Sequence, residues 1–300
     1  MNKILLNCTA ATFTAVLISA TVHAQTFGPA QNNPFGISTT GTFTSPTFVD
    51  LDGDADMDMF SGDADGNFYY FDNAGTVALA AFNPSIMNPF GLTDIGDNSY
   101  PTFADLDNDG DLDLMAGEQG AGFHYFENTG SAVAPAFGAA QFCPFGLTSL
   151  PTINSTVDLA DLDNDGDQDM IAGEIIGNLY YFENTGTATV PSFTSPVTNP
   201  FGISPTGGNL TPSFTDLDGD GDFDILTGET LSDFYYFENT GTVSAASYAS
   251  STMNPFSLTA IGSYSTTTLA DMNNDGLIDL MSGEASNGFY YFEQTNCTPP

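Results

Sequence analysis

The segment DLDNDGDLDLMAGE, residues 105–118, carries the clearest fold signal in this 300-residue chain. Aspartates occupy positions 1, 3, 5, 7 and 9 of its loop, glycine stands at position 6, and an apolar run follows. The same nine-residue loop starts again at Asp50, Asp161, Asp216 and Asp271, at steps of 55, 56, 55 and 55 residues. A fixed step of this size indicates a repeat protein in which each unit is one supersecondary element.

Two other motifs follow the same step. The prolines of a Pro-Phe-Gly motif stand at Pro34, Pro89, Pro144, Pro200 and Pro255, and aromatic runs cover residues 68–71, 123–126, 179–182, 234–237 and 289–292. The pieces between turn residues are short, and none keeps a helical period for three turns, so the sequence predicts an all-β fold. In the second unit we expect strands near residues 102–104, 112–116, 122–127 and 136–139. Four strands per repeat of this length predict a β-propeller blade.

The two ends of the repeat region predict how the ring closes. Thr26-Phe27 corresponds to Ala81-Phe82 and its equivalents, which follow the aromatic run in each unit, whereas the last unit ends soon after Phe292. The N-terminal segment would therefore supply what the last unit lacks and hide the open edge strands. We expect a closed ring of five four-stranded blades, with the N- and C-terminal strands completing one blade. A fragment of a larger ring is the alternative.

The charge of the chain excludes several partners. Asp and Glu number 38 against one Lys or Arg, a formal net charge of −37, while 41% of residues are hydrophobic and can build a core. A chain with almost no cations cannot neutralise phosphates, so we expect neither nucleic acid nor anionic membranes as partners. The cations that balance the carboxylates must come from outside the chain.

The loop itself predicts which cation this is. Carboxylates at positions 1, 3, 5 and 9 are too crowded to remain ionised without a metal. Oxygen-only ligands in a tight loop with Gly at position 6 favour Ca²⁺, and the absence of His and Cys excludes zinc and copper. Position 12 is Ala116 in the second unit, so the bidentate Glu of an EF-hand is missing. Five solvated acidic turns are the simpler alternative.

The loop, with the flanking Leu-x-x-Gly-Glu and Tyr-Phe-Glu-Asn motifs, resembles the FG-GAP/VCBS repeat of integrin-α-type propellers, and this resemblance covers residues 26–296. It implies up to five Ca²⁺ ions, each bound by side chains at positions 1, 3, 5 and 9 and by the backbone carbonyl at position 7. The chain differs from the family in Ala55, in Asn273 and in having five units instead of seven. The implied ligands are Asp50, Asp52, Asp54, Asp56 and Asp58; Asp105, Asp107, Asp109, Asp111 and Asp113; Asp161, Asp163, Asp165, Asp167 and Asp169; Asp216, Asp218, Asp220, Asp222 and Asp224; and Asp271, Asn273, Asp275, Leu277 and Asp279.

The termini predict export. Lys3, an apolar stretch and the small-residue site before Gln25 are typical of a secretory signal peptide over residues 1–24. The propeller would then occupy residues 25–296 and a short tail residues 297–300, in a protein that is secreted or at the cell surface. Cys143 and Cys297 can form one disulfide in that compartment, but they occupy non-equivalent places in the repeat.

The remaining acids and His124 point to binding more than to catalysis. One acid follows the second strand of each unit and another ends the aromatic strand, and they either bind further cations or accept hydrogen bonds from turn amides, which we favour. His124 lacks a partner nucleophile, and a catalytic centre needs residues that break the repeat.

We therefore expect no enzyme and no other cofactor, but a monomeric adhesion or protein-binding module with an extracellular protein or glycan ligand. By the resemblance, the ligand would lie on the face opposite the metal loops. A lectin with one site per blade, or an accessory domain of a larger secreted enzyme, is the alternative.

Overall fold

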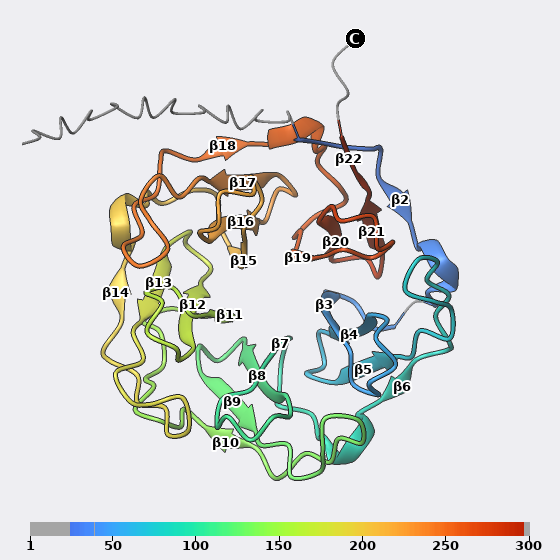
Figure 1. Cartoon of the computed structure of the whole chain (residues 1–300), viewed down its shortest axis with the longest axis horizontal. Coiled ribbons are helices and arrows are strands. Elements are labelled where there is room, and N and C mark those ends of the chain that lie inside the picture. Colours follow the sequence, from blue (N-terminus) through green and yellow to red (C-terminus); the bar gives the residue numbers. More distant parts are fainter. Residues whose placement is uncertain (1–24, 39, 297–300) are drawn as a thin grey trace, which may run out of the picture.

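The computed structural model describes residues 25–38 and 40–296, and it shows five antiparallel four-stranded sheets arranged as a ring (Figure 1). The predicted all-β propeller of five blades is confirmed. Blade 1 contains β3 (Ser45–Val49), β4 (Asp58–Gly62), β5 (Phe68–Phe71) and β6 (Ile86–Met87); blade 2 contains β7 (Ser99–Ala104), β8 (Asp113–Glu118), β9 (Phe123–Phe126) and β10 (Gln141–Phe142); blade 3 contains β11 (Thr156–Ala160), β12 (Asp169–Gly173), β13 (Leu179–Phe182) and β14 (Val197–Thr198); blade 4 contains β15 (Thr211–Thr215), β16 (Asp224–Gly228), β17 (Phe234–Phe237) and β18 (Thr252–Met253).

Blade 5 is completed from the other end of the chain, as predicted. It contains β19 (Thr268–Ala270), β20 (Asp279–Gly283) and β21 (Phe289–Phe292), and its fourth strand is β2 (Gln31–Asn32). A two-stranded sheet of β1 (Gln25–Phe27) and β22 (Gln294–Asn296) lies next to this junction and places Phe27 opposite Gln294. The other units have a single bridge at the same place, such as Asn73 opposite Phe82. The seam therefore reproduces the pairing within every other unit.

The fourth strand of the second unit was predicted at residues 136–139, and this is wrong. The strand is β10 (Gln141–Phe142), and Phe137 makes only an isolated bridge to Asn128. Each outer strand is two residues long and exposed, so it carries no alternation that a pattern could reveal. Such short edges also offer little template for pairing with another chain.

The core lies between neighbouring blades, because both faces of the middle strands are covered. At the start of β9, Phe123 packs edge-to-face on Phe182 of blade 3, with ring centroids 5.7 Å apart. Phe289 of blade 5 packs in the same way on Phe71 of blade 1, at 5.8 Å. The contact that joins blades in the middle of the chain therefore also closes the ring.

Glycines at the ends of the second strands allow this close approach. A Cβ added to Gly117 would overlap the backbone carbonyl of Ser155 in the next blade, and one added to Gly283 would overlap that of Thr44 across the seam. The helical elements among the described residues are the single 3₁₀ turns η1 (Pro34–Gly36), η2 (Pro89–Gly91), η3 (Pro200–Gly202) and η4 (Pro255–Ser257). None of the helices in the described part is long and apolar enough to cross a membrane. The predicted signal peptide and Cys297 lie outside the described residues.

Candidate metal centre

Each aspartate loop joins the innermost strand of its blade to the second strand, and its own amides hold its carboxylates. In blade 2, Gly110 N donates to Asp105 Oδ2 at 3.1 Å, and Asp109 N donates to Asp107 Oδ1 at 3.3 Å. Gly110 has a φ of 95°, in the left-handed region that favours glycine, and Ala55 takes the same position in blade 1 with a φ of 74°. The loop therefore keeps its conformation in blade 1 despite the missing glycine, at a cost on the order of 1 kcal/mol.

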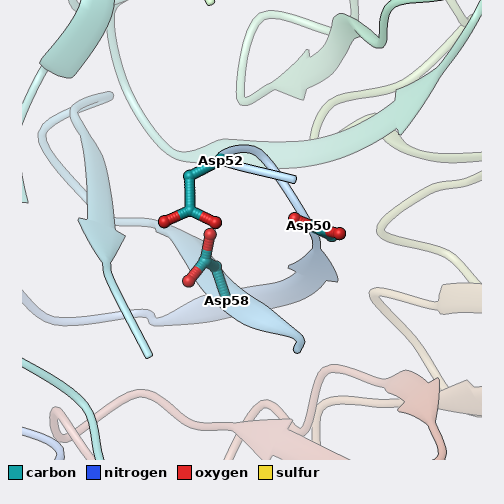
Figure 2. A group of neighbouring side chains, drawn as sticks. All are labelled: Asp50, Asp52 and Asp58. Carbon is teal, nitrogen blue, oxygen red and sulfur yellow. The ribbon is translucent and has the colours of Figure 1, made fainter. Parts of the chain in front are cut away.

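The loops bring carboxylate oxygens together in four blades. The three acids of each group place oxygen atoms within 4.8 Å of one another, and in blade 1 they are Asp50, Asp52 and Asp58 (Figure 2). The other groups use positions 1, 3 and 5: Asp105, Asp107 and Asp109; Asp161, Asp163 and Asp165; and Asp216, Asp218 and Asp220. Oxygen ligands at such spacing suit a hard divalent cation.

The fifth loop has the same backbone but a weaker donor set. Asp275 N donates to Asp271 Oδ1 at 3.1 Å and to Asn273 Oδ1 at 3.0 Å, which repeats the pattern of Asp109 in blade 2. An amide replaces the position-3 carboxylate, and Leu277 replaces the position-7 acid. The fifth site would therefore place less negative charge around a bound cation than the other four sites.

The position-9 aspartates have a structural role that the loop motif alone did not predict. Asp113 is 1% exposed, and its carboxylate accepts hydrogen bonds from Asn128 N at 2.8 Å, Tyr125 hydroxyl at 2.8 Å and Leu106 N at 3.3 Å. Burial raises the pKa of Asp113 to about 6, against the opposing effect of these hydrogen bonds. The signal was present, because a tyrosine follows position 9 by twelve residues in every unit. This buried carboxylate ties the loop to the third strand.

The position-7 aspartates provide the test of whether a cation fits. Asp56, Asp111, Asp167 and Asp222 are 5–7% exposed, and in each of them the Oδ1 atom has no hydrogen-bond partner. Burial, together with the neighbouring loop carboxylates, raises the pKa of Asp167 to about 6. A buried acid beside other acids needs a proton or a cation. The donor set therefore fits Ca²⁺, with position 7 of the loop contributing negative charge.

The two further acids of each unit differ in their surroundings. The acid after the second strand accepts turn amides in blades 1, 3, 4 and 5; Asp63 Oδ1, for example, accepts from Asn67 N at 2.9 Å. In blade 2 its equivalent Glu118 lies 3.5 Å from His124 Nε2, and the His124 ring packs edge-to-face on Phe142. The acids that end the aromatic strands are mostly exposed. His124 is thus a packed residue of β9, opposite Phe142 of the outer strand β10.

Comparison with known proteins agrees with the repeat. The FG-GAP-like repeat model matches residues 50–116 and 161–227. No curated protein matches the sequence.

Among solved structures, the chain is similar to a Photorhabdus luminescens Tc holotoxin pore at 14% identity and a TM-score of 0.45, over 91% of this chain and 15% of that one. It is similar to an Agrocybe aegerita lectin that recognises non-reducing terminal N-acetylglucosamine at 17% identity and a TM-score of 0.45, over 80% and 60% of the two chains. A family 43 β-1,3-galactosidase is similar at 10% identity and a TM-score of 0.48, over 85% and 94%. The chain thus spans about one seventh of the toxin chain and three fifths of the lectin chain.

The matched segments begin at position 1 of the first and third aspartate loops and end in the second strands of blades 2 and 4. Each matched segment therefore covers one full repeat step, from the aspartate loop of one blade through that of the next. The chain contains FG-GAP-like repeats over residues 50–116 and 161–227, within a five-bladed β-propeller.

Proposed function

We propose that the protein is an exported calcium-binding propeller that acts as a non-catalytic adhesion or protein-binding module, with Ca²⁺ stabilising the aspartate loops. The observation that carries this proposal is the buried, unpartnered Oδ1 atom of position 7 beside the loop carboxylates of four blades. Without a cation, each loop holds crowded like charges, some of them shielded from water. With a cation, the same atoms become ligands or charge partners, and the loop becomes rigid.

Calcium removal tests the metal assignment. Binding to the folded state alone stabilises it by about 3 kcal/mol when free Ca²⁺ is a hundredfold above its dissociation constant. We expect a chelator to lower the melting temperature by many degrees and added Ca²⁺ to restore it, with Mg²⁺ less effective. Elemental analysis of the dialysed protein should find up to five calcium ions. A melting temperature that does not respond to chelation, together with no bound calcium, would contradict the assignment.

A rigid ring with exposed loops suits the binding of an extracellular partner. The net charge of −37 gives the surface a negative field that keeps the chain soluble and favours basic partners. Binding of cells or extracellular proteins to the immobilised propeller, lost on chelation, tests this part of the proposal. Secretion of the full chain into the medium, with cleavage before Gln25, tests the localisation.

Repeat-equivalent pockets favour the lectin as a second candidate. One pocket between blades 1 and 2 is lined by Asp52, Tyr70, Asp72 and Phe90, and a pocket between blades 3 and 4 is lined by the equivalent Asp163, Tyr181, Glu183 and Phe201. Aromatic rings beside carboxylates can stack on a sugar and accept its hydroxyl protons. A glycan array distinguishes the candidates, because a lectin should bind one sugar class and lose that binding in Phe90→Ala and Phe201→Ala together, which remove the more exposed rings of the two pockets.

A further inference from the structure

The repeat is broken at one place in the centre of the ring. One repeat position in the innermost strands holds Thr47, Thr102, Ser213 and Thr268 in four blades, and the equivalent residue in blade 3 is Asp158. Asp158 Oδ1 accepts a hydrogen bond from Thr102 Oγ1 of blade 2 at 2.9 Å, and its Oδ2 accepts one from Phe214 N of blade 4 at 2.7 Å. One acid of blade 3 is therefore bonded to both neighbouring blades.

This acid faces a cavity. The innermost strands β3, β7, β11, β15 and β19 surround the ring axis (Figure 1), and they line a central cavity of about 210 Å³. Asp158 is the one acid among the described residues that line it, and Tyr100 is the other titratable group there. The walls also include hydroxyl groups and the apolar side chains of Pro46, Pro101 and Val157. Each lining strand leads into the aspartate loop of its blade.

No Lys or Arg stands among the described residues to pair with this carboxylate. The chain's one Lys or Arg is Lys3, which lies outside the described residues and within the predicted signal peptide. Each oxygen of Asp158 uses one lone pair for the hydrogen bond described above and keeps a second. The carboxylate is therefore fixed in position while it can still accept a donor from the cavity.

The chemistry of the cavity favours an organic cation over a metal. Ca²⁺ needs six to eight oxygens at about 2.4 Å, whereas this cavity offers one carboxylate and a set of hydroxyl groups. Some of these hydroxyls already make hydrogen bonds; Ser213 Oγ, for example, donates to the carbonyl oxygen of Thr267 at 2.8 Å. A primary ammonium group has three donors that match a carboxylate and neighbouring hydroxyls. Its alkyl chain would lie along the proline and valine walls.

We propose that the central cavity binds a primary ammonium group, with Asp158 as its anionic partner. The ammonium group belongs either to a free small amine or to a lysine side chain of a partner polypeptide. Burial raises the pKa of Asp158 to about 6, so the carboxylate is mainly ionised at pH 7 and pairs with the cation there. The site breaks the fivefold repeat, so it binds one ammonium group per ring, independently of the calcium loops.

Calorimetric titration of the calcium-loaded chain with n-butylamine and cadaverine tests this site, with n-butanol as the uncharged comparison. We expect one site for each amine and none for butanol. Asp158→Thr introduces the residue of blades 1, 2 and 5, and it should weaken amine binding about tenfold or more because the charged acceptor is lost. Asp94→Asn removes an exposed acid outside the loops and should leave amine binding unchanged. Equal binding by the wild type and Asp158→Thr would overturn the proposal.

Two additions complete the experiment. If Asp158→Thr does not fold, Asp158→Asn keeps the shape of the side chain, and the same loss of amine binding is expected. A short lysine-containing peptide with blocked ends distinguishes the two sources: binding of the peptide indicates a partner's lysine, and binding of the amines alone indicates a free amine. Binding of none of these probes to the wild type would also overturn the proposal.

Discussion

The hydroxyl of Tyr125 donates a 2.8 Å hydrogen bond to Asp113 Oδ2, and the equivalent bond is present in all five blades. Both partners are buried, so removing the hydroxyl leaves a carboxylate oxygen less well satisfied. We expect Tyr125→Phe to reduce the free energy of unfolding by about 1–3 kcal/mol, measured by urea denaturation in Ca²⁺.

Tyr235→Phe is the matched control, because this tyrosine is half-buried and the structure assigns its hydroxyl no hydrogen bond. A change within about 0.5 kcal/mol is expected there. Equal losses in the two variants would mean that the bond to Asp113 contributes nothing particular.

Two glycines in blade 2 should respond differently to alanine. Gly110 has open space where a Cβ would be added, and its φ is 95°. Gly110→Ala should therefore lower the free energy of unfolding by only about 1 kcal/mol, because alanine is strained in a left-handed backbone conformation. Gly117→Ala forces a Cβ into the carbonyl of Ser155 and should cost more, about 3 kcal/mol, because the blades must separate. Denaturation midpoints of the two variants test this order, and a larger loss for Gly110→Ala would contradict the packing between blades.

Replacing Cys143 should stabilise the protein. In the other four blades, the equivalent residue is an asparagine whose Oδ1 accepts from the first amide of the third strand, as Asn199 does from Leu179 N at 3.0 Å. Cys143 has a φ of 45°, a conformation that asparagine tolerates better than cysteine. We expect Cys143→Asn to raise the unfolding free energy by about 1 kcal/mol under reducing conditions. Asn199→Cys, the reverse change in blade 3, should lower it by a similar amount.

Asp158 should make stability depend on pH. Its folded-state pKa of about 6 lies above the ordinary 3.8, because burial penalises the charged form. The folded protein therefore binds this proton more tightly than the unfolded chain, and the contribution of the group to stability falls as pH rises from 4 to 6. The unfolding free energy of the wild type relative to Asp158→Asn should fall by roughly 2 kcal/mol between pH 4 and pH 7.

That measurement needs an amine-free buffer, because an ammonium ligand would stabilise the charged form. Tyr100, the other titratable group of the cavity, has a pKa raised by burial to about 12 and does not titrate in this range. A difference between the two proteins that does not change with pH would show that Asp158 titrates normally.

The sequence predicted most of the architecture because the strongest signals repeat five times. The Asp loops and the aromatic runs indicated the blades, and Thr26-Phe27 indicated the seam. Outer strands such as β10 could not be predicted, because two exposed residues show no alternation of polar and apolar side chains. The bond between Asp113 and Tyr125 joins residues of different motifs, and the position of Asp158 at the ring axis depends on how the strands are arranged. Those relationships exist only once the blades are assembled.

The pairing of β1 with β22 has a mechanical consequence. Gln25 lies opposite Asn296, and the two strands are antiparallel, so both ends of the propeller leave the ring at the same point. A force that pulls these ends apart acts on one bonded pair at a time and opens the sheet like a zipper. The next pair to open is β2 with β21, after which blade 5 has no outer strand. Under tension, the ring would open at its seam before any aspartate loop carries load.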